Sequence, residues 1–116
     1  MAILNFADAT VTLLLVPVDM RFGFDRLAAI ARDILRINLN INNQYIVFFS
    51  KNRTICKIIH IDEKGTVLIV RKLHEGKFEQ LLSKQNDPDF VNLTLPELEK
   101  FFNGENIYTK RIGYYH

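Results

Sequence analysis

The sequence predicts a single α+β domain in which an antiparallel meander sheet of three to five strands is packed by two main helices, at about residues 23–36 and 95–103. Closely spaced runs of β-branched and aromatic residues between residues 45 and 73 predict the sheet. Apolar residues recur at steps of three and four in two flanking stretches, and this spacing predicts one apolar helix face in each. A chain of 116 residues, 48% of them hydrophobic, is long enough to bury a core without metals or disulfides.

The first strand and the corner after it come from residues 10–27. Residues 10–16 are rich in β-branched residues, and Pro17 ends the strand because proline has no N–H for a central ladder. The helix that follows begins at Phe22 or Gly23, with an aspartate in its first turn, where the helix dipole favours an anion. We expect hydrogen bonds to local backbone or a salt bridge of Asp19 and Arg21 to fix this corner, which comprises Pro17, Asp19, Arg21, Gly23 and Asp25.

Three strands are predicted in the middle of the chain, over residues 45–50, 54–61 and 66–73. The gaps between them, 51–53 and 62–65, have the length and residue types of hairpin turns, so the strands should form a meander. The middle strand has apolar residues on both faces. We therefore expect helices on one face of the sheet and a fourth strand or a partner on the other.

Three connecting segments lack a regular pattern. Residues 38–43 are rich in Asn, which competes for local backbone hydrogen bonds and favours a loop. Residues 77–82 are expected to form a short strand or a turn, and residues 83–89 an exposed loop.

The second helix has clear start and stop signals. Thr94 is the predicted N-cap and Glu97 stands at the capping-box position three residues later. Asn103-Gly104 provides the end of the helix. The predicted domain comprises residues 1–104, and residues 105–116 form an aromatic and basic tail.

The charge of the chain is small and unevenly distributed. Fifteen basic and thirteen acidic residues give a formal net charge of +2. Residues 51–77 hold seven basic and three acidic residues, and this net +4 points either to an anionic partner or to a solvated sheet face. The candidate contact residues for DNA or a protein partner are Arg21, Arg26, Arg53, Lys57, Arg71, Lys72 and Lys77.

The single cysteine, Cys56, cannot form an internal disulfide, which fits a reducing cytoplasm. It lies in a strand beside isoleucines and is expected to be an inert core thiol. It shares no metal-ligand spacing with His60, His74 or His116, and we expect sheet-surface roles for His60 and His74. The apolar run 11–16 is far shorter than the ~20 residues of a membrane span, so we expect a soluble, cytoplasmic protein.

Catalytic patterns are weak throughout the chain. A metal-dependent nuclease would have to use Asp19, Asp25 or Asp62, but a helix start and a turn already account for these carboxylates. The sequence contains neither a glycine-rich phosphate loop nor a serine nucleophile elbow. We therefore expect no catalytic residue, no metal, no cofactor and no small-molecule substrate.

Four pieces of the sequence, taken in order, resemble a known family. They are Pro17-Val18-Asp19-Met20-Arg21 with Gly23-Phe24-Asp25 and Leu27; Tyr45-Ile46-Val47-Phe48-Phe49 with Asn52-Arg53; Leu68-Ile69-Val70-Arg71-Lys72-Leu73 with Glu75-Gly76-Lys77-Phe78; and Leu93-Thr94 through Gly104. Together they span nearly the whole chain, which resembles the small TnpB accessory proteins of IS66-type bacterial insertion sequences. The family often has Trp-Pro after the third piece, whereas Phe78 is followed here by Glu79-Gln80.

The resemblance implies a part in transposition beside a separate, larger transposase that carries out the strand chemistry, and it implies no catalytic residue in this chain. The first hypothesis is a non-enzymatic accessory protein that contacts the cognate transposase, element DNA or both. The second is a protein-interaction or structural module without nucleic-acid contact, in which strand 45–49 and the tyrosine-rich tail cover a partner. The third is a small metal-dependent nuclease that uses Asp19, Asp25 or Asp62.

Overall fold

A computed structural model describes residues 9–36, 43–81 and 89–107. The elements in these ranges are β1 (Thr10–Leu14), α1 (Phe24–Leu35), β2 (Gln44–Phe49), β3 (Ile55–Asp62), β4 (Gly65–Lys72), β5 (Phe90–Leu93) and α2 (Leu95–Phe102). The predicted loops at 38–43 and 83–89 fall almost wholly outside the described residues, as does the tail after residue 107.

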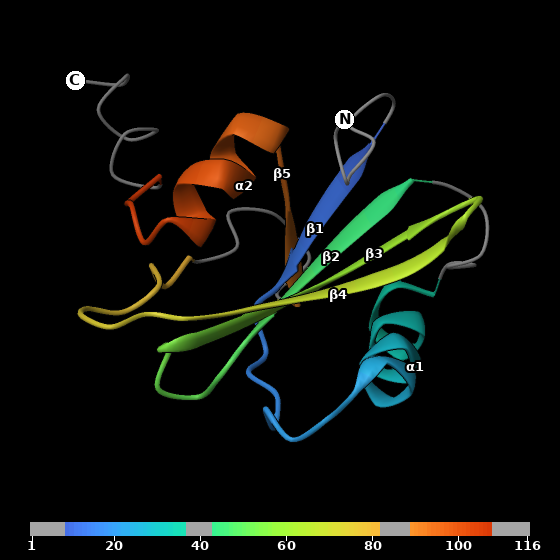
Figure 1. The fold of residues 1–116 in the computed structure, drawn as a ribbon, viewed down its shortest axis with the longest axis horizontal. Helices are drawn as coiled ribbons and strands as arrows, with labels where there is room; N and C mark the ends of the chain where they lie inside the picture. The colour runs from blue at the N-terminus through green and yellow to red at the C-terminus, as the bar shows by residue number, and fades with distance from the viewer. Residues whose placement is uncertain (1–8, 37–42, 82–88, 108–116) are drawn as a thin grey trace.

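The strands form one mixed sheet in the order β4-β3-β2-β1-β5 (Figure 1). β2, β3 and β4 make the predicted antiparallel meander. β1, however, pairs parallel with β2, with Thr10 beside Gln44. The prediction of a purely antiparallel sheet is therefore wrong. The connection from β1 to β2 carries α1 across one face, and such a crossover returns the chain in the direction in which it left.

The sequence pattern does not reveal β5, which pairs antiparallel with the outer edge of β1 and places Leu93 opposite Val11. Four residues are too few for an alternation of apolar and polar positions to be recognised. Residues 77–81 form no strand, although Phe78 and Leu81 are buried. Residues 77–81 are thus coil that packs under α2, and β5 is the next described element.

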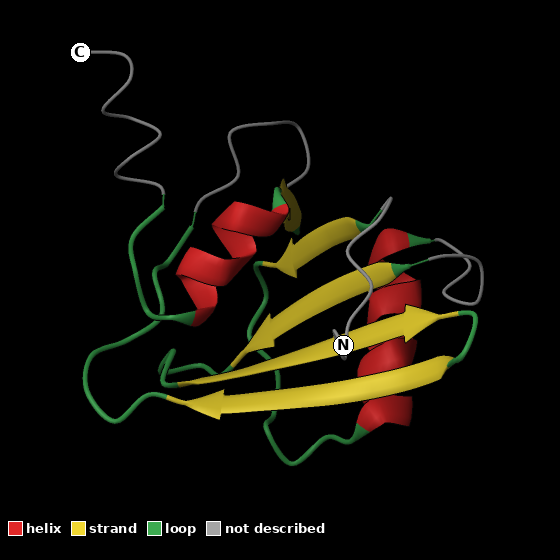
Figure 2. Cartoon of the chain, turned by 45° about the horizontal axis from the view of Figure 1, so that its top comes forward, coloured by secondary structure: helices red, strands yellow, loops and turns green. Residues whose placement is uncertain are grey.

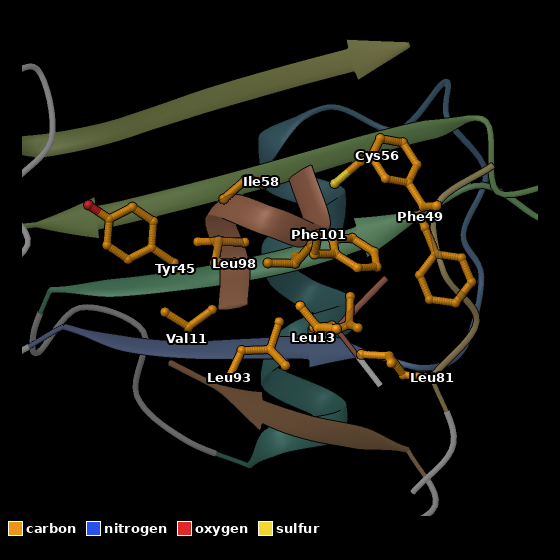
Figure 3. Packing of buried hydrophobic residues seen from close by; sticks show 13 residues of the cluster. Val11, Leu13, Tyr45, Phe49, Cys56, Ile58, Leu81, Leu93, Leu98 and Phe101 are labelled. Atoms are coloured by element: carbon orange, nitrogen blue, oxygen red, sulfur yellow. The ribbon is translucent and has the colours of Figure 1, made fainter. Parts of the chain in front are cut away.

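The two helices lie on opposite faces of the sheet (Figures 1 and 2). The expectation of helices on one face and a strand or partner on the other is therefore wrong. The cluster under α1 comprises Leu14, Leu27, Ala28, Ala31, Ile46, Phe48, Ile59 and Ile61. The cluster under α2, shown in Figure 3, includes Val11, Leu13, Tyr45, Phe49, Cys56, Ile58, Leu93, Leu98 and Phe101.

Burial on both faces explains why β2 is apolar from Tyr45 to Phe49. Each of its residues is at most 8% exposed, because it lies between β1 and β3 with a helix on either side. The suggestion that strand 45–49 covers a partner is therefore wrong. Of the tail, Ile107 is 2% exposed and packs in the α2 cluster.

Both helix starts follow the local sequence signals. Gly23 is the N-cap of α1, and Asp25 stands in its first turn. In α2 the Thr94 hydroxyl accepts the N–H of Glu97 at 3.2 Å, and the Glu97 carboxylate accepts the N–H of Thr94 at 2.9 Å. This is the predicted capping box, which satisfies two N–H groups that the helix itself cannot. Gly104, with φ +81°, turns the chain away after the helix.

Candidate interaction surfaces

The corner between β1 and α1 contains a local ion pair. The Asp19 carboxylate accepts the backbone N–H of Arg21 at 2.8 Å, and its second oxygen lies 2.6 Å from the Arg21 guanidinium. These hydrogen bonds lower the pKa of Asp19 to about 2. The pair is therefore complete above the ordinary carboxyl pKa of about 4 and is lost only as the pH falls toward 2. The sequence predicts this backbone hydrogen bond and this salt bridge of Asp19 and Arg21. It stays a prediction that these contacts stabilise the conformation of the corner.

Three of the seven candidate basic residues gather around Phe22, directly before α1. Lys57 extends from β3 on the α1 face, and its ammonium donates to the Phe22 carbonyl at 2.8 Å. The Arg26 guanidinium lies 4.6 Å from the centroid of the Phe22 ring, within cation–π range. Arg21 adjoins Phe22 in the chain, and 89% of its side chain is exposed.

Two further candidates, Arg53 and Arg71, lie away from Phe22, and their guanidinium groups donate hydrogen bonds within the domain. Arg71 donates to the Phe102 carbonyl at 3.0 Å and to the Asn103 amide oxygen at 2.8 Å, and it lies 4.2 Å over the Phe102 ring. Arg53 donates to the Phe78 carbonyl at 3.2 Å. These contacts tie α2 and the coil at Phe78 to the sheet, so a structural role accounts for both arginines.

The seven basic residues therefore do not form one patch. Lys72 stands opposite Ile55 in the sheet register, on the same face as Lys57, whereas Arg71 points to the α2 face. Lys72 and Lys77 are both exposed, and within the described ranges neither has a hydrogen-bond or ion-pair partner. The positive stretch in the sequence thus divides between two faces because successive strand residues point to opposite sides.

The carboxylates of the nuclease hypothesis also lie apart. Asp19 and Asp25 flank the start of α1, whereas Asp62 ends β3 in the hairpin turn. There its carboxylate accepts the N–H groups of Lys64 and Gly65. Among residues 9–36, 43–81 and 89–107 there is no group of three or more His, Cys, Asp or Glu side chains that could hold a metal ion.

An apolar groove opens on the α2 face, between α2 and strands β3 and β4. It encloses about 440 Å³. Phe101 of α2 points into the core, while Leu95 and Phe102, seven residues apart on the same helix, face the groove. The lining consists of Tyr45, Ile58, Ile69, Leu95, Pro96, Leu98, Glu99 and Phe102.

The sequence does not reveal this groove, because its walls come from β2, β3, β4 and α2. Figure 3 shows how Tyr45, Ile58 and Leu98 lie near one another on this face. The only local signal is in α2, where Leu95 and Phe102 extend the apolar stripe beyond what Leu98 and Phe101 need for the core.

His60 is buried beside the groove residue Tyr45. Its side chain is 1% exposed, its ring centroid lies 4.1 Å from that of Tyr45, and its Nε2 bonds to the Asn43 side chain. The Nδ1 atom has no partner in the part of the chain that the structure describes. The predicted surface role is therefore wrong for His60. Burial lowers the pKa of His60, whereas burial and the charge of Asp62 raise the pKa of Tyr45 to about 12.

Lowering the pH from about 7 to 5 is expected to reduce the free energy of unfolding through His60. Its folded pKa lies below the ordinary value of 6.5, so the unfolded chain takes up the proton first. The stabilising contribution is complete above pH 6.5 and is lost as the pH falls through 6.5 toward the folded pKa.

Urea denaturation at several pH values measures this effect. His60→Gln should make the free energy of unfolding depend less on pH. His74 is exposed, and the His74→Gln protein should show the same pH dependence as the wild type. If the His60→Gln protein retains the full pH dependence, another group is responsible.

Comparisons with known proteins find one partial relative and one family. The uncharacterized protein y4hO of Sinorhizobium fredii is 32% identical over 60 residues, which make up 52% of this chain and 51% of y4hO. The chain thus aligns with about half the length of that relative. No solved structure matches the chain. Within the described residues, neither helix is long and apolar enough to cross a membrane.

A family model described as IS66 Orf2-like protein matches residues 9–111. The match includes the corner, the meander, the groove and α2. Since it extends over far more than half of the sequence, the chain belongs to the IS66 Orf2-like family of insertion-sequence proteins.

Proposed function

We propose that this chain is a non-enzymatic accessory protein of transposition that contacts the separate transposase of its element through the α2 groove. The groove carries this proposal, because seven of its eight lining side chains are apolar and it is open to solvent. Contiguous apolar surface rimmed by polar groups is characteristic of protein contact sites. The candidate cations Arg53 and Arg71, by contrast, are used in contacts within the domain.

The occupant that fits the groove is an apolar segment of the transposase with one basic residue near its edge. Glu99 is the single charged side chain of the lining and is exposed. A cation opposite Glu99 would orient the segment and favour its encounter, while the apolar contacts would supply most of the affinity.

A pull-down and a binding titration with the cognate transposase test this function. Leu95→Glu places a carboxylate in the groove and is compatible with the helix, since the first turn of a helix favours an anion. Glu99→Lys reverses the charge at the rim. Each should weaken binding about tenfold or more. Val16→Glu, at an exposed apolar residue outside the groove, is the matched control and should bind as the wild type does.

Failure of the wild-type chain to bind the transposase would contradict the proposal. Unchanged binding by both groove variants would move the contact to another surface.

The cations around Phe22 favour a second candidate function, contact with the phosphates of element DNA. A mobility shift at about 50 mM salt tests it, and three phosphate contacts would give a slope of log affinity against log salt of about −3. Replacing Arg21 and Arg26 with glutamine should make the slope less negative by about 2. If the chain does not shift the DNA at low salt, contact with phosphates is excluded and protein contact is the remaining function. Cleavage of the DNA in the presence of Mg²⁺ would instead favour the nuclease hypothesis.

A further inference from the structure

Strand β4 forms one edge of the sheet (Figure 1). An edge strand carries unpaired backbone groups along its outer side. The N–H of Leu73 donates to the Thr54 carbonyl at 2.9 Å, so the odd-numbered residues of this strand direct their backbone groups toward β3. The even-numbered residues therefore direct theirs outward. Within the described residues no neighbour pairs with this outer row, which consists of Thr66, Leu68, Val70 and Lys72.

The side chains of β4 are those of an interior strand. Residues 67–70 read Val-Leu-Ile-Val, so both faces are apolar, as in strands that have neighbours on both edges. Leu68 is 39% exposed and Val70 53% exposed, because the α1 cluster reaches only to β3. A long apolar edge of this kind is a template for pairing with another strand.

The edge is complementary to a second copy of itself. Because only even-numbered residues offer outward hydrogen bonds, an antiparallel pair of β4 strands can place a two-fold axis at Ile69. Apolar side chains then meet apolar ones, and each cation meets a neutral residue. The pairs across the axis are Ile69 with Ile69, Leu68 with Val70, Val67 with Arg71, and Thr66 with Lys72.

The two neighbouring registers are worse. Moving the axis to residue 68 would bring Lys72 up to the hairpin turn of the second copy at Lys64, and like charges brought close together are destabilising. Moving it to residue 70 would place Lys72 opposite Leu68. The sequence of the hairpin thus distinguishes one register from its alternatives.

We propose that two copies of this chain associate through β4, in antiparallel register about Ile69, to form one continuous sheet. The hydrogen bonds of the outer row are then satisfied, and Leu68 and Val70 are covered. Ile69, which lines the α2 groove, meets Ile69 of the second copy, so that the two grooves become neighbours across the axis.

Cysteine cross-linking of the full chain tests the register. In a pair that is not hydrogen-bonded the Cα atoms are about 4.5 Å apart, within the range of a disulfide. Ile69→Cys should therefore give a linked dimer on mild oxidation. Val67→Cys is the matched control, because the two Val67 positions would be offset by about 13 Å along the strands and should not link. Cys56 is buried in every copy and does not compete.

Sizing across a range of concentrations tests the association without relying on cysteine variants. The wild type should show a concentration-dependent dimer, and Val70→Lys should shift the equilibrium to monomer at least about tenfold, since the new ammonium groups of the two copies would be diagonal neighbours across the axis, where like charges repel each other. A wild type that is monomeric throughout, or Val67→Cys that links as well as Ile69→Cys, would overturn the proposal. Leu95→Glu and Glu99→Lys change residues of α2 and leave β4 unaltered, so both variants should dimerise normally, and loss of transposase binding can be told apart from loss of the dimer.

Discussion

Replacing Phe101 with alanine is expected to lower the free energy of unfolding by about 3–5 kcal/mol. The Phe101 side chain is fully buried under α2, and its ring stacks on that of Phe78 with centroids 5.3 Å apart. Alanine would leave a cavity between the helix and the sheet, and a close-packed core can close such a cavity only in part. Urea denaturation of the two proteins gives the difference directly.

Phe102→Ala is the matched control on the same helix. Phe102 is only partly buried and lines the groove, with Arg71 stacked on its outer side. Truncating Phe102 should therefore lower the free energy of unfolding clearly less than truncating Phe101 does. An equal loss for both variants would contradict the orientation of α2, which places Phe101 in the core and leaves Phe102 at the groove.

Local signals in the sequence predict the individual elements well. The start of α2 is determined by Thr94 and Glu97, which lie three residues apart and bond to each other's backbone. The ion pair of Asp19 and Arg21 is equally local. The hairpins around residues 51–54 and 62–65 follow from turn residues between apolar runs. In each case the interacting groups are near neighbours in the chain, so their spacing carries the information.

Pairing between distant segments is not encoded in this way. An apolar run such as β1 is compatible with a neighbour in either direction, and only the path of α1 across the sheet makes its pairing with β2 parallel. The four residues of β5 are recognisable as a strand only once the outer edge of β1 is known to be open. The predicted antiparallel meander therefore holds for β2–β4 and fails beyond them.

The candidate sites show the same division. The positive stretch of the sequence suggests one surface, but alternation along the strands sends Lys57 and Arg71 to opposite faces. His60 reads as a surface histidine, yet the stacking of Tyr45 in the next strand buries it. The groove depends on where α2 packs on the sheet, and no local sequence pattern predicts that position.

The Cys56 thiol is expected to resist labelling until the domain unfolds. It is fully buried in the α2 cluster, and this burial raises its pKa to about 12. The reactive thiolate of Cys56 is therefore far scarcer at neutral pH than that of an exposed cysteine. A disulfide reagent should therefore react with the folded chain only as fast as rare opening exposes the thiol.

Labelling of Cys56 then reports on the packing that Phe101 provides, since both residues belong to one cluster. If global unfolding controls access, the labelling rate is proportional to the unfolded population. A loss of about 3–5 kcal/mol in Phe101→Ala should accelerate labelling between about a hundredfold and a few thousandfold, and Phe102→Ala should accelerate it much less. Rapid labelling of the wild type in the absence of denaturant would show that the sheet opens locally near Cys56. The rate ratio would then fall short of the ratio calculated from urea denaturation.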